Sequence, residues 1–351
     1  HYEGKEFLYQ IIDEAQYIKN HSTQNARSVK AIRSDHRLAL TGTPIENRLS
    51  ELWSIFDYLM PGYLYSYQKF KKRFEIPIVK NRDPYVIELL KKMTGPFILR
   101  RLKSEVLSEL PSKSESLVQA SMEGEQRKLY LANAMLLRDQ IMEQGEDAIA
   151  RQRFHILAML TKLRQICCDP GLCYDDYAGP SAKLETCMEL IRESTEAGHK
   201  VLLFSQFTSM LARIEERLSS EGYSYYVLKG DTSKEQRAQM VERFNRDTTQ
   251  VFLISLKAGG TGLNLIGADV VIHYDPWWNI AAQNQATDRA HRIGQKRNVQ
   301  VYKLVVKDSI EEKILNLQQS KKELADAIIC EQSTGASLVN MTKEDLLELL
   351  S

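Results

Sequence analysis

Five short apolar runs in the second half of the chain constrain its fold most. They span residues 201–204, 223–228, 250–254, 270–274 and 299–306, and stretches with a helical pattern separate them. Runs this short, in alternation with helices, are typical of a parallel sheet that is covered by helices on both faces. We therefore predict an α/β fold for this part of the chain.

The first 52 residues show the same alternation in a smaller form. Residues 7–12 and 37–40 are predicted strands, and a polar segment follows each of them. An aromatic-rich helical region then extends to about residue 110, and two long helical patterns lie between residues 123 and 168. The predicted order is therefore a partial α/β lobe, a helical block, a complete α/β lobe and a closing helix. The corresponding ranges are 1–52, 53–178, 179–308 and 309–351.

The start of the last region carries a helix signal. Ser309 is followed three residues later by Glu312, which is the spacing of a capping box. Ile310 and Ile314 begin an apolar stripe, so we expect this helix to pack back onto the body of the protein. A further short helix is predicted from Lys343.

The composition excludes some classes of protein. The formal net charge is +1, so any contact with nucleic acid must come from local patches. The 5 cysteines have irregular spacings without a Cys-x-x-Cys, which favours reduced thiols in an intracellular protein over a zinc site. The apolar runs are far shorter than the roughly 20 residues of a membrane span, so we expect no membrane contact. The chain begins with His1, which indicates a piece of a longer protein.

Two acidic residues directly follow the first predicted strand. Asp13 and Glu14 come after Ile11 and Ile12, and we expect that strand to be buried. An aspartate here can hold Mg²⁺ that bridges nucleotide phosphates, and the adjacent glutamate can accept a proton from an attacking water. Taken alone, a solvated strand end is the commoner explanation. A tight turn with two hydroxyls, Thr41 to Pro44, follows the next strand and shifts the balance towards a ligand site.

Two further segments carry chemical signals. Residues 256–265 hold three glycines and Lys257 after a strand, so backbone N–H groups could approach a phosphate, although a plain loop is equally compatible. Arg289 and Arg292 are three residues apart, so on a helical turn they would share a face, with Gln285 four residues before Arg289. Two guanidinium groups on one face can stabilise the charge on a transferring phosphoryl group. The alternative is a solvated basic helix.

Together these segments resemble the Swi/Snf-type ATPases, the chromatin-remodeller branch of the DEAD/DEAH helicase superfamily. Residues 13–16, 41–47, 201–207, 255–265 and 285–295 resemble the second to the sixth motif of that family, in order. The segments that resemble its helical insertions are residues 97–101, 110–111 and 163–167. The resemblance covers nearly the whole chain.

The resemblance implies two RecA-like lobes, of which this chain would hold the second completely and the first in part, with inserted helical regions. It implies ATP and Mg²⁺ as cofactors, and double-stranded DNA as a partner that is tracked without strand separation. The implied catalytic residues are Asp13, which would hold the Mg²⁺, Glu14, Arg289 and Arg292. The implied nucleotide-binding residues are Gln16, Gly260, Gly262 and Gln285. The implied DNA-binding residues are Thr41, Ser205, Gln206, Lys257, Thr261 and Trp277, whereas core packing is the preferred explanation for Trp278.

One part of the family pattern is missing. A phosphate loop of the Gly-x-x-x-x-Gly-Lys-Ser/Thr kind is needed to grip ATP, but the only Gly-Lys pair is Gly4-Lys5, which Glu6 follows. We expect that loop, with the rest of the first lobe, to precede residue 1, and this chain alone to hydrolyse little ATP. A DNA-binding module without turnover and a strand-separating RNA helicase are the alternatives. The resemblance implies a DNA-bound protein as the cargo, but these motifs do not identify it.

Residues 74–78 and 165–170 resemble prokaryotic members of the family. A prokaryotic member would lie in the cytoplasm with the nucleoid, and a eukaryotic one in the nucleus.

Overall fold

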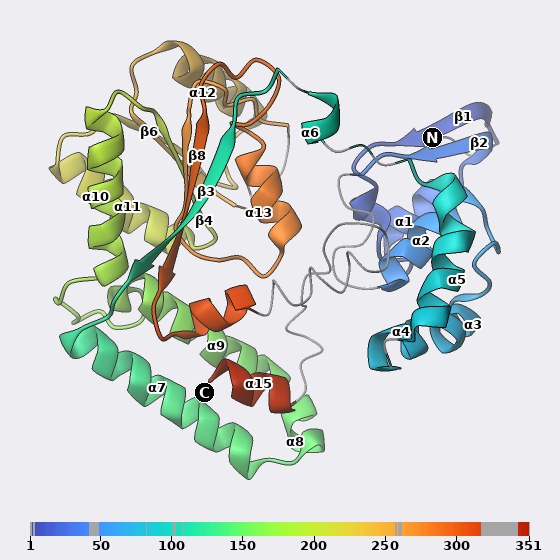
Figure 1. Ribbon diagram of the computed structural model, residues 1–351, viewed down its shortest axis with the longest axis horizontal. Helices are drawn as coiled ribbons and strands as arrows, with labels where there is room; N and C mark the ends of the chain where they lie inside the picture. The colour runs from blue at the N-terminus through green and yellow to red at the C-terminus, as the bar shows by residue number, and fades with distance from the viewer. Residues whose placement is uncertain are drawn as a thin grey trace. The chain divides into compact units, whose positions relative to one another are not determined.

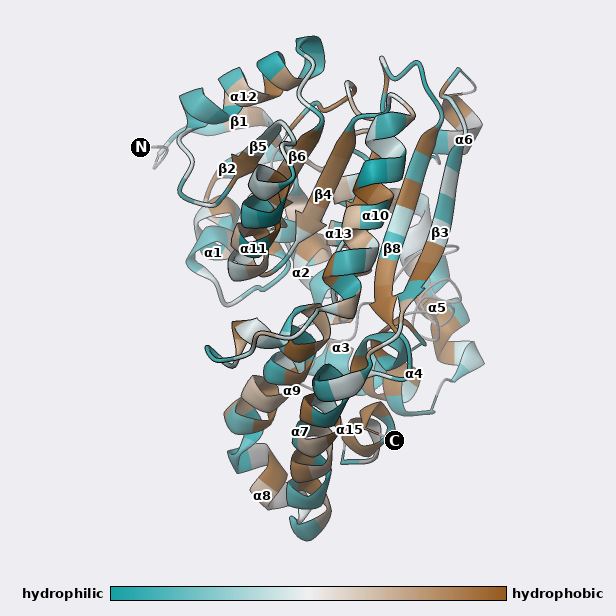
Figure 2. Ribbon diagram, turned by 90° about the vertical axis from the view of Figure 1, so that its left-hand side faces the viewer, coloured by the Kyte–Doolittle hydropathy of each residue, from teal (hydrophilic) through white to brown (hydrophobic). Residues whose placement is uncertain are grey.

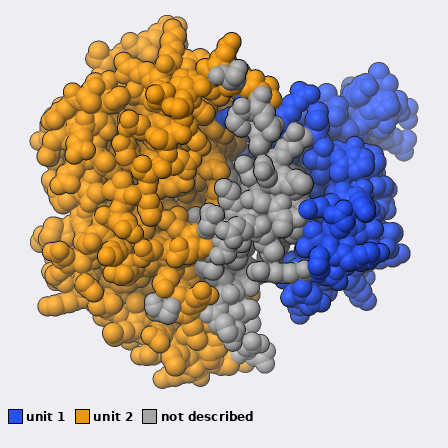
Figure 3. Space-filling model, viewed as in Figure 1, with its two compact units in different colours: residues 1–103, 318–336 blue, residues 104–317, 337–351 orange. Residues whose placement is uncertain are grey.

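The computed structural model describes residues 2, 4–41, 49–81, 83–99, 101, 103–107, 109–256, 258, 262–316 and 343–350. The chain forms two compact units (Figure 3). Among the described residues, unit 1 extends to Lys103, and unit 2 comprises residues 104–316 and 343–350. No helix of the described part is both long enough and apolar enough to cross a membrane.

Unit 1 begins with two parallel strands, β1 (Glu6–Ile12) and β2 (Arg33–Ala39), which pair in register from Glu6 with Arg33 to Ile12 with Ala39. The short η1 (Ala15–Ile18) and α1 (Gln24–Lys30) connect them. The expectation that the first strand is buried is wrong. None of its residues is buried, and Leu8 and Ile11 are 64% and 58% exposed, because the described residues include only one neighbouring strand and few elements that cover this sheet.

The rest of unit 1 is helical, as the sequence indicates. Its elements are α2 (Leu49–Leu59), α3 (Tyr67–Phe70), η2 (Lys71–Glu75), α4 (Ile76–Asn81), α5 (Pro84–Thr94) and η3 (Gly95–Phe97). The short α6 (Lys103–Val106) follows. Trp53, Phe56, Phe70 and Phe74 form the centre of an aromatic core between these helices. The π-helical turn η2 lies just before Pro77, which lacks the N–H that a regular helix needs at that point.

Unit 2 contains a six-stranded sheet with the order β3-β8-β7-β4-β6-β5, in which all neighbouring pairs are parallel. Its strands are β3 (Lys113–Ala120), β4 (Val201–Ser205), β5 (Tyr225–Leu228), β6 (Val251–Ser255), β7 (Val270–His273) and β8 (Val299–Val306). The five predicted strands of this region are confirmed. The sequence analysis missed β3, because its residues are polar and mostly exposed at the edge of the sheet.

Helices cover both faces of this sheet (Figure 1). The helices beside the strands are α10 (Ala182–Glu196), α11 (Thr208–Ser220), α12 (Lys234–Arg246) and α13 (Ile280–Thr287). Val201 and Leu203 of β4 face a core with α10 and α11, whereas Leu202 and Phe204 face a second core with α12 and α13. Successive side chains of a strand point to opposite faces, so the continuous apolar run fits a strand between two helical layers. Figure 2 shows β4 and β6 as apolar along most of their length, up to the serine that ends each strand.

The remaining helices of unit 2 form a block below the sheet in Figure 1. They are α7 (Gly124–Glu143), α8 (Glu146–Arg151), α9 (Arg153–Cys168), η4 (Pro170–Leu172) and α15 (Lys343–Leu349). Helix α15 confirms the helix predicted from Lys343. A further helix over residues 310–316, the closing helix, buries Ile310 and Ile314 completely. The expected division of the chain into four parts stays a prediction.

The cap of the closing helix differs in detail from a capping box. The Ser309 hydroxyl accepts a hydrogen bond from the N–H of Glu311, at 3.2 Å, and not from that of Glu312. Glu312 accepts from the N–H of Asp308, at 3.1 Å. Both bonds are shifted by one residue from the predicted pattern, and Asp308 has a positive φ of 53° at this turn.

Candidate functional site

The acidic residues of unit 1 lie where β1 ends, and a short chain of hydrogen bonds connects them to the end of β2. The Glu14 N–H donates to Asp13 Oδ1 at 2.8 Å, in a left-handed conformation with a φ of 53°. Gln16 Nε2 donates to Glu14 Oε2 at 2.5 Å, and Thr41 Oγ1 donates to Gln16 Oε1 at 2.9 Å. The structure therefore brings together three residues that the sequence analysis assigned to two separate motifs.

The chemistry of this cluster fits a nucleotide-bound cation. Among the described residues, no group of three or more His, Cys, Asp or Glu side chains could hold a metal ion by itself. Mg²⁺ is commonly bound by one or two carboxylates together with substrate phosphates, so a single exposed Asp13 is compatible with such an ion. The turn after Thr41, including Gly42 to Asn47, lies outside the described residues.

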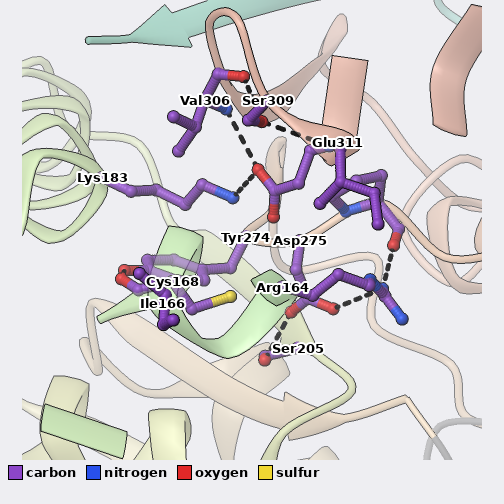
Figure 4. A network of polar contacts seen from close by, with 12 residues as sticks. Arg164, Ile166, Cys168, Lys183, Ser205, Tyr274, Asp275, Val306, Ser309 and Glu311 are labelled. Carbon is purple, nitrogen blue, oxygen red and sulfur yellow. Dashed lines mark hydrogen bonds and ion pairs between the residues drawn. The ribbon is translucent and has the colours of Figure 1, made fainter. Parts of the chain in front are cut away.

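In unit 2 the carboxyl ends of β4 and β7 meet at the Asp275 carboxylate (Figure 4). Ser205 Oγ donates to Asp275 Oδ1 at 2.6 Å, and the Gln206 side-chain amide donates to Oδ2 at 2.5 Å. The Gln206 backbone N–H donates to the same carboxylate at 3.2 Å. Ser205 has no exposed surface, whereas Gln206 is partly exposed. Of these two predicted DNA-binding residues, only Gln206 therefore has exposed surface with which it could contact DNA.

A buried arginine lies on the other side of Asp275. Arg164 of α9 donates from Nη2 to the Pro276 carbonyl at 2.5 Å, and the same nitrogen lies 3.9 Å from Asp275 Oδ2. Its guanidinium faces the rings of Phe207 and Trp278, each at 5.7 Å. Trp277 is partly buried against the core of α12 and α13, and its N–H donates to Gln283 Oε1 at 3.4 Å. We call Arg164, Ser205, Gln206, Asp275 and Pro276 the Asp275 cluster.

The two candidate phosphate-sensing arginines follow α13 rather than lie on it. The helix ends at Thr287, and Arg289 and Arg292 lie in the turns after it, so the expectation that they share a helical face is wrong. Gly294, with a φ of 102°, marks a backbone that leaves helical geometry. Gln285 is on the helix itself.

Both arginines nevertheless lie against the glycine-containing segment. The Leu265 N–H donates to the Arg289 carbonyl at 3.0 Å, and Arg292 Nη1 donates to the Leu263 carbonyl at 3.2 Å. Gly262, with a φ of 55°, is the residue directly before Leu263. Lys257, Gly260 and Thr261 lie outside the described residues. The structure therefore joins the fifth and sixth motif through Leu263 and Leu265, two buried residues to which the sequence analysis assigned no role.

Gln295 holds the arginine turn in place. Its side-chain amide donates to the carbonyls of Ile266, Ala268 and Ala290, at 3.2, 2.8 and 3.1 Å. Its Oε1 accepts from the N–H groups of the two residues that follow it, at 2.9 and 3.0 Å. The sequence analysis missed this role. A glutamine directly after a turn glycine is the only signal that could have pointed to it.

A second buried network of polar contacts connects the closing helix to the rest of unit 2 (Figure 4). Lys183 Nζ donates to Glu311, and both side chains are completely buried. Glu311 also accepts from the Val306 N–H at 3.0 Å, and the Tyr130 hydroxyl accepts from the Ile310 N–H at 2.7 Å. Burial raises the pKa of Glu311, and the adjacent ammonium group opposes that shift. This network joins α7 and α10 to the closing helix.

The fold and these clusters define a class: an α/β unit with the all-parallel sheet of a RecA-like lobe and polar clusters at its strand ends. The sequence matches the family model for the SNF2-related domain over residues 2–172. It matches the model for the helicase conserved C-terminal domain over residues 182–294. The chain belongs to the SWI2/SNF2 family of ATP-dependent helicase-like ATPases.

Several relatives support this assignment. An uncharacterized ATP-dependent helicase of Mycoplasma pneumoniae is 40% identical over 98% of this chain and 32% of its own length. A putative ATP-dependent helicase/translocase of Bacillus subtilis is 41% identical over 96% of this chain and 37% of its own. An ISWI chromatin-remodeling complex ATPase of Arabidopsis thaliana is 36% identical over 97% of this chain. The chain thus spans about a third of the length of these curated relatives, and the bacterial relatives support a prokaryotic member.

A solved structure agrees. The SWI2/SNF2 ATPase core of Sulfolobus solfataricus, in complex with double-stranded DNA, is 36% identical to this chain with a TM-score of 0.52. The match covers 92% of this chain and 73% of that one. The resemblance to the Swi/Snf-type ATPases and the RecA-like fold class are therefore confirmed, whereas the roles of single residues stay predictions.

Proposed function

We propose that this chain is the C-terminal part of a motor that hydrolyses ATP and moves along double-stranded DNA without separating its strands. The observation that carries the proposal is the joining of the arginine turn to the segment after Gly262 within one unit. Such an arrangement lets nucleotide bound at the arginines affect a backbone segment of the same unit. The solved relative with double-stranded DNA supports a duplex as the track.

In this proposal each of the predicted site residues has a role. Asp13 holds Mg²⁺ together with the nucleotide phosphates, where the ion neutralises charge, and Glu14 accepts a proton from the attacking water. Arg289 and Arg292 stabilise the charge on the γ-phosphate. Gln16, which accepts a hydrogen bond from Thr41 and donates one to Glu14, connects the ATP side of unit 1 to Thr41. Gln285, Gly260 and Gly262 contact the nucleotide, and Gln206, Lys257, Thr261 and Trp277 contact the DNA backbone.

The proposal includes parts that lie beyond this chain. A phosphate loop and the remaining strands of the first lobe would precede residue 1, so the catalytic test belongs to the full-length protein. A DNA-bound protein is the proposed cargo, because relatives in the family are chromatin-remodeling ATPases.

The test compares ATP turnover by the full-length protein without nucleic acid, with duplex DNA and with duplex RNA. We expect duplex DNA to raise kcat, and neither duplex to be unwound in a parallel fluorescence assay. Unwinding of duplex RNA would instead identify a strand-separating RNA helicase. Salt-dependent DNA binding without any turnover would identify a DNA-binding module.

A further inference from the structure

The Asp275 cluster contains one charged residue that sequence motifs do not place with the DNA-contacting segments. Arg164 lies in the C-terminal half of α9, 111 residues before Asp275, and only 4% of its surface is exposed. The other residues that α9 buries are apolar or cysteine, such as Leu160, Leu163 and Ile166. An arginine among them is unexpected, because desolvation of a guanidinium is costly unless its partners compensate for it.

The contacts of Arg164 are concentrated on two strand ends. Its Nη2 donates to the Pro276 carbonyl at 2.5 Å and lies 3.9 Å from Asp275 Oδ2. Its Nε is buried and has no hydrogen-bond partner among the described residues. A buried donor without a partner destabilises a protein, so packing alone would favour an apolar residue at this position. The arrangement favours a role that depends on where the guanidinium points.

The residues that Arg164 contacts lie next to residues that are proposed to contact DNA. Asp275 accepts from Ser205 and Gln206 at the end of β4, and Pro276 directly precedes Trp277. The guanidinium also faces the rings of Phe207 and Trp278, at 5.7 Å each, which restricts both loops. One side chain of the helical block therefore contacts residues of both loops, as Figure 4 shows for its contact with Asp275.

We propose that Arg164 is a positioning residue that sets the geometry of the Gln206 and Trp277 loops for the DNA backbone. This inference rests on the proposed function. Arg164 is too buried to touch DNA, so it acts through Asp275 and Pro276. It also connects α9 to the strand ends, so a movement of the helical block would change the grip on DNA.

The chain offers a control that matches Arg164 in its polar partners, although its side chain is 39% exposed against 5% for Arg164. Arg213 of α11 donates from Nη2 to the Gly171 carbonyl at 2.8 Å, and its Nη1 lies 3.7 Å from Asp169 Oδ2. It thus has the same kind of partners as Arg164, a backbone carbonyl and an aspartate. Its partners belong to the segment after α9 and not to the strand ends. A substitution of Arg213 therefore removes an arginine that contacts a backbone carbonyl and an aspartate, and it leaves the Asp275 cluster unchanged.

The experiment uses Arg164→Met, Arg164→Lys and Arg213→Met in the full-length protein. The readout is ATP turnover against the concentration of duplex DNA, which separates kcat from the KM for DNA. Methionine keeps much of the side-chain volume, and Asp275 keeps its three donors from Ser205 and Gln206. We expect Arg164→Met to raise the KM for DNA about tenfold, the effect of one lost charge-assisted contact. Arg213→Met should stay within about twofold of the wild type, since that is the scatter of a change that leaves the site intact.

The lysine variant provides the second readout. Lysine keeps the charge but lacks the planar guanidinium that reaches Pro276 and faces two rings, so its KM should fall between those of the wild type and Arg164→Met. If Arg164→Met does not fold, a folded Arg164→Lys with a wild-type KM overturns the inference. Equal KM values for Arg164→Met and Arg213→Met overturn it as well, while DNA stimulation of the wild type leaves the proposed function intact. A wild type that DNA does not stimulate contradicts the proposed function itself.

Discussion

Polar side chains lie at or directly after the carboxyl ends of β1 and β4, but the surroundings of the two strands differ. All five residues of β4 are buried between two apolar cores, whereas no residue of β1 is buried. The polar end of β4 is held by the buried carboxylate of Asp275, which lies just after the neighbouring strand β7. The polar end of β1 is held by the local contacts of Glu14, Gln16 and Thr41. The comparison shows that a similar strand-end site can be fixed either by a complete core or by short-range hydrogen bonds.

Because of this difference, we expect substitutions at different positions to affect either ATP turnover or folding stability. In unit 2 the hydrogen bonds of Gln295 hold the arginine turn, so substitutions of the arginine side chains should change turnover and leave folding largely unaffected. Substitutions in its strands should do the opposite. In unit 1 the exposed strand should tolerate changes in its apolar side chains, because they contribute little buried area in the described structure.

The largest expected effect concerns Arg292. In the full-length protein, Arg292→Ala should lower DNA-stimulated ATP turnover by about 10³, the typical contribution of an arginine that stabilises a transferring phosphoryl group. Lys296→Ala is the control, because this exposed residue of the same turn donates to Gln295 only through its backbone. Steady-state ATPase assays with saturating duplex DNA measure both. Near wild-type turnover of Arg292→Ala would remove the arginine from the proposed mechanism.

The second-largest expected effect concerns the stability that β4 and β1 contribute. Leu203→Ala in β4 should lower the free energy of unfolding by about 2–5 kcal/mol, because it leaves a cavity in a fully buried core. Leu8→Ala in β1, where the side chain is 64% exposed, should change it by less than about 0.5 kcal/mol. Denaturant unfolding of this chain measures both values. Similar losses for the two variants would mean that β1 is covered as well as β4.

The smallest effect is a pH dependence of stability in unit 2. Burial, with a further contribution from Lys303, lowers the pKa of His273 to about 3. The unfolded chain protonates this histidine near its ordinary pKa of 6.5, so the stability that neutral His273 allows is fully present above that pH and is lost as the pH falls towards 3. Between pH 6.5 and 5.5 the loss should be on the order of 1 kcal/mol.

The measurement for this prediction is the free energy of unfolding at pH 6.5 and 5.5 for the wild type, His273→Gln and His155→Gln. The glutamine at position 273 can still approach Thr287, which His273 contacts through Nε2 at 2.8 Å, but it does not titrate. The control residue, His155, is exposed. A pH dependence that persists unchanged in His273→Gln would assign it to other groups.

Much of the fold could be predicted from the sequence, because burial on both faces makes the strands of unit 2 continuous apolar runs. The edge strand β3 could not, since only one neighbour pairs with it and its polar side chains remain in solvent. The expected burial of β1 was wrong for the complementary reason: an apolar run does not show whether other elements pack against it.

The candidate site was predictable to the extent that chain order determines it. Parallel strands place their carboxyl ends at one edge, so Ser205, Gln206 and Asp275 could be expected near one another. The position of Arg164 could not, because nothing in a helical pattern indicates a partner 111 residues away. The end of α13 before Arg289 was missed because the hydrogen bonds of Gln295, rather than local propensity, determine the path of that turn.

The most direct test of the central claim is a triplex-displacement assay with the full-length protein. A third strand is bound to duplex DNA, and its release is followed with and without ATP. The account predicts release that requires ATP and Mg²⁺, leaves the duplex intact and is lost in Arg292→Ala. Absence of release despite DNA-stimulated ATP turnover, or separation of the duplex strands, would contradict it.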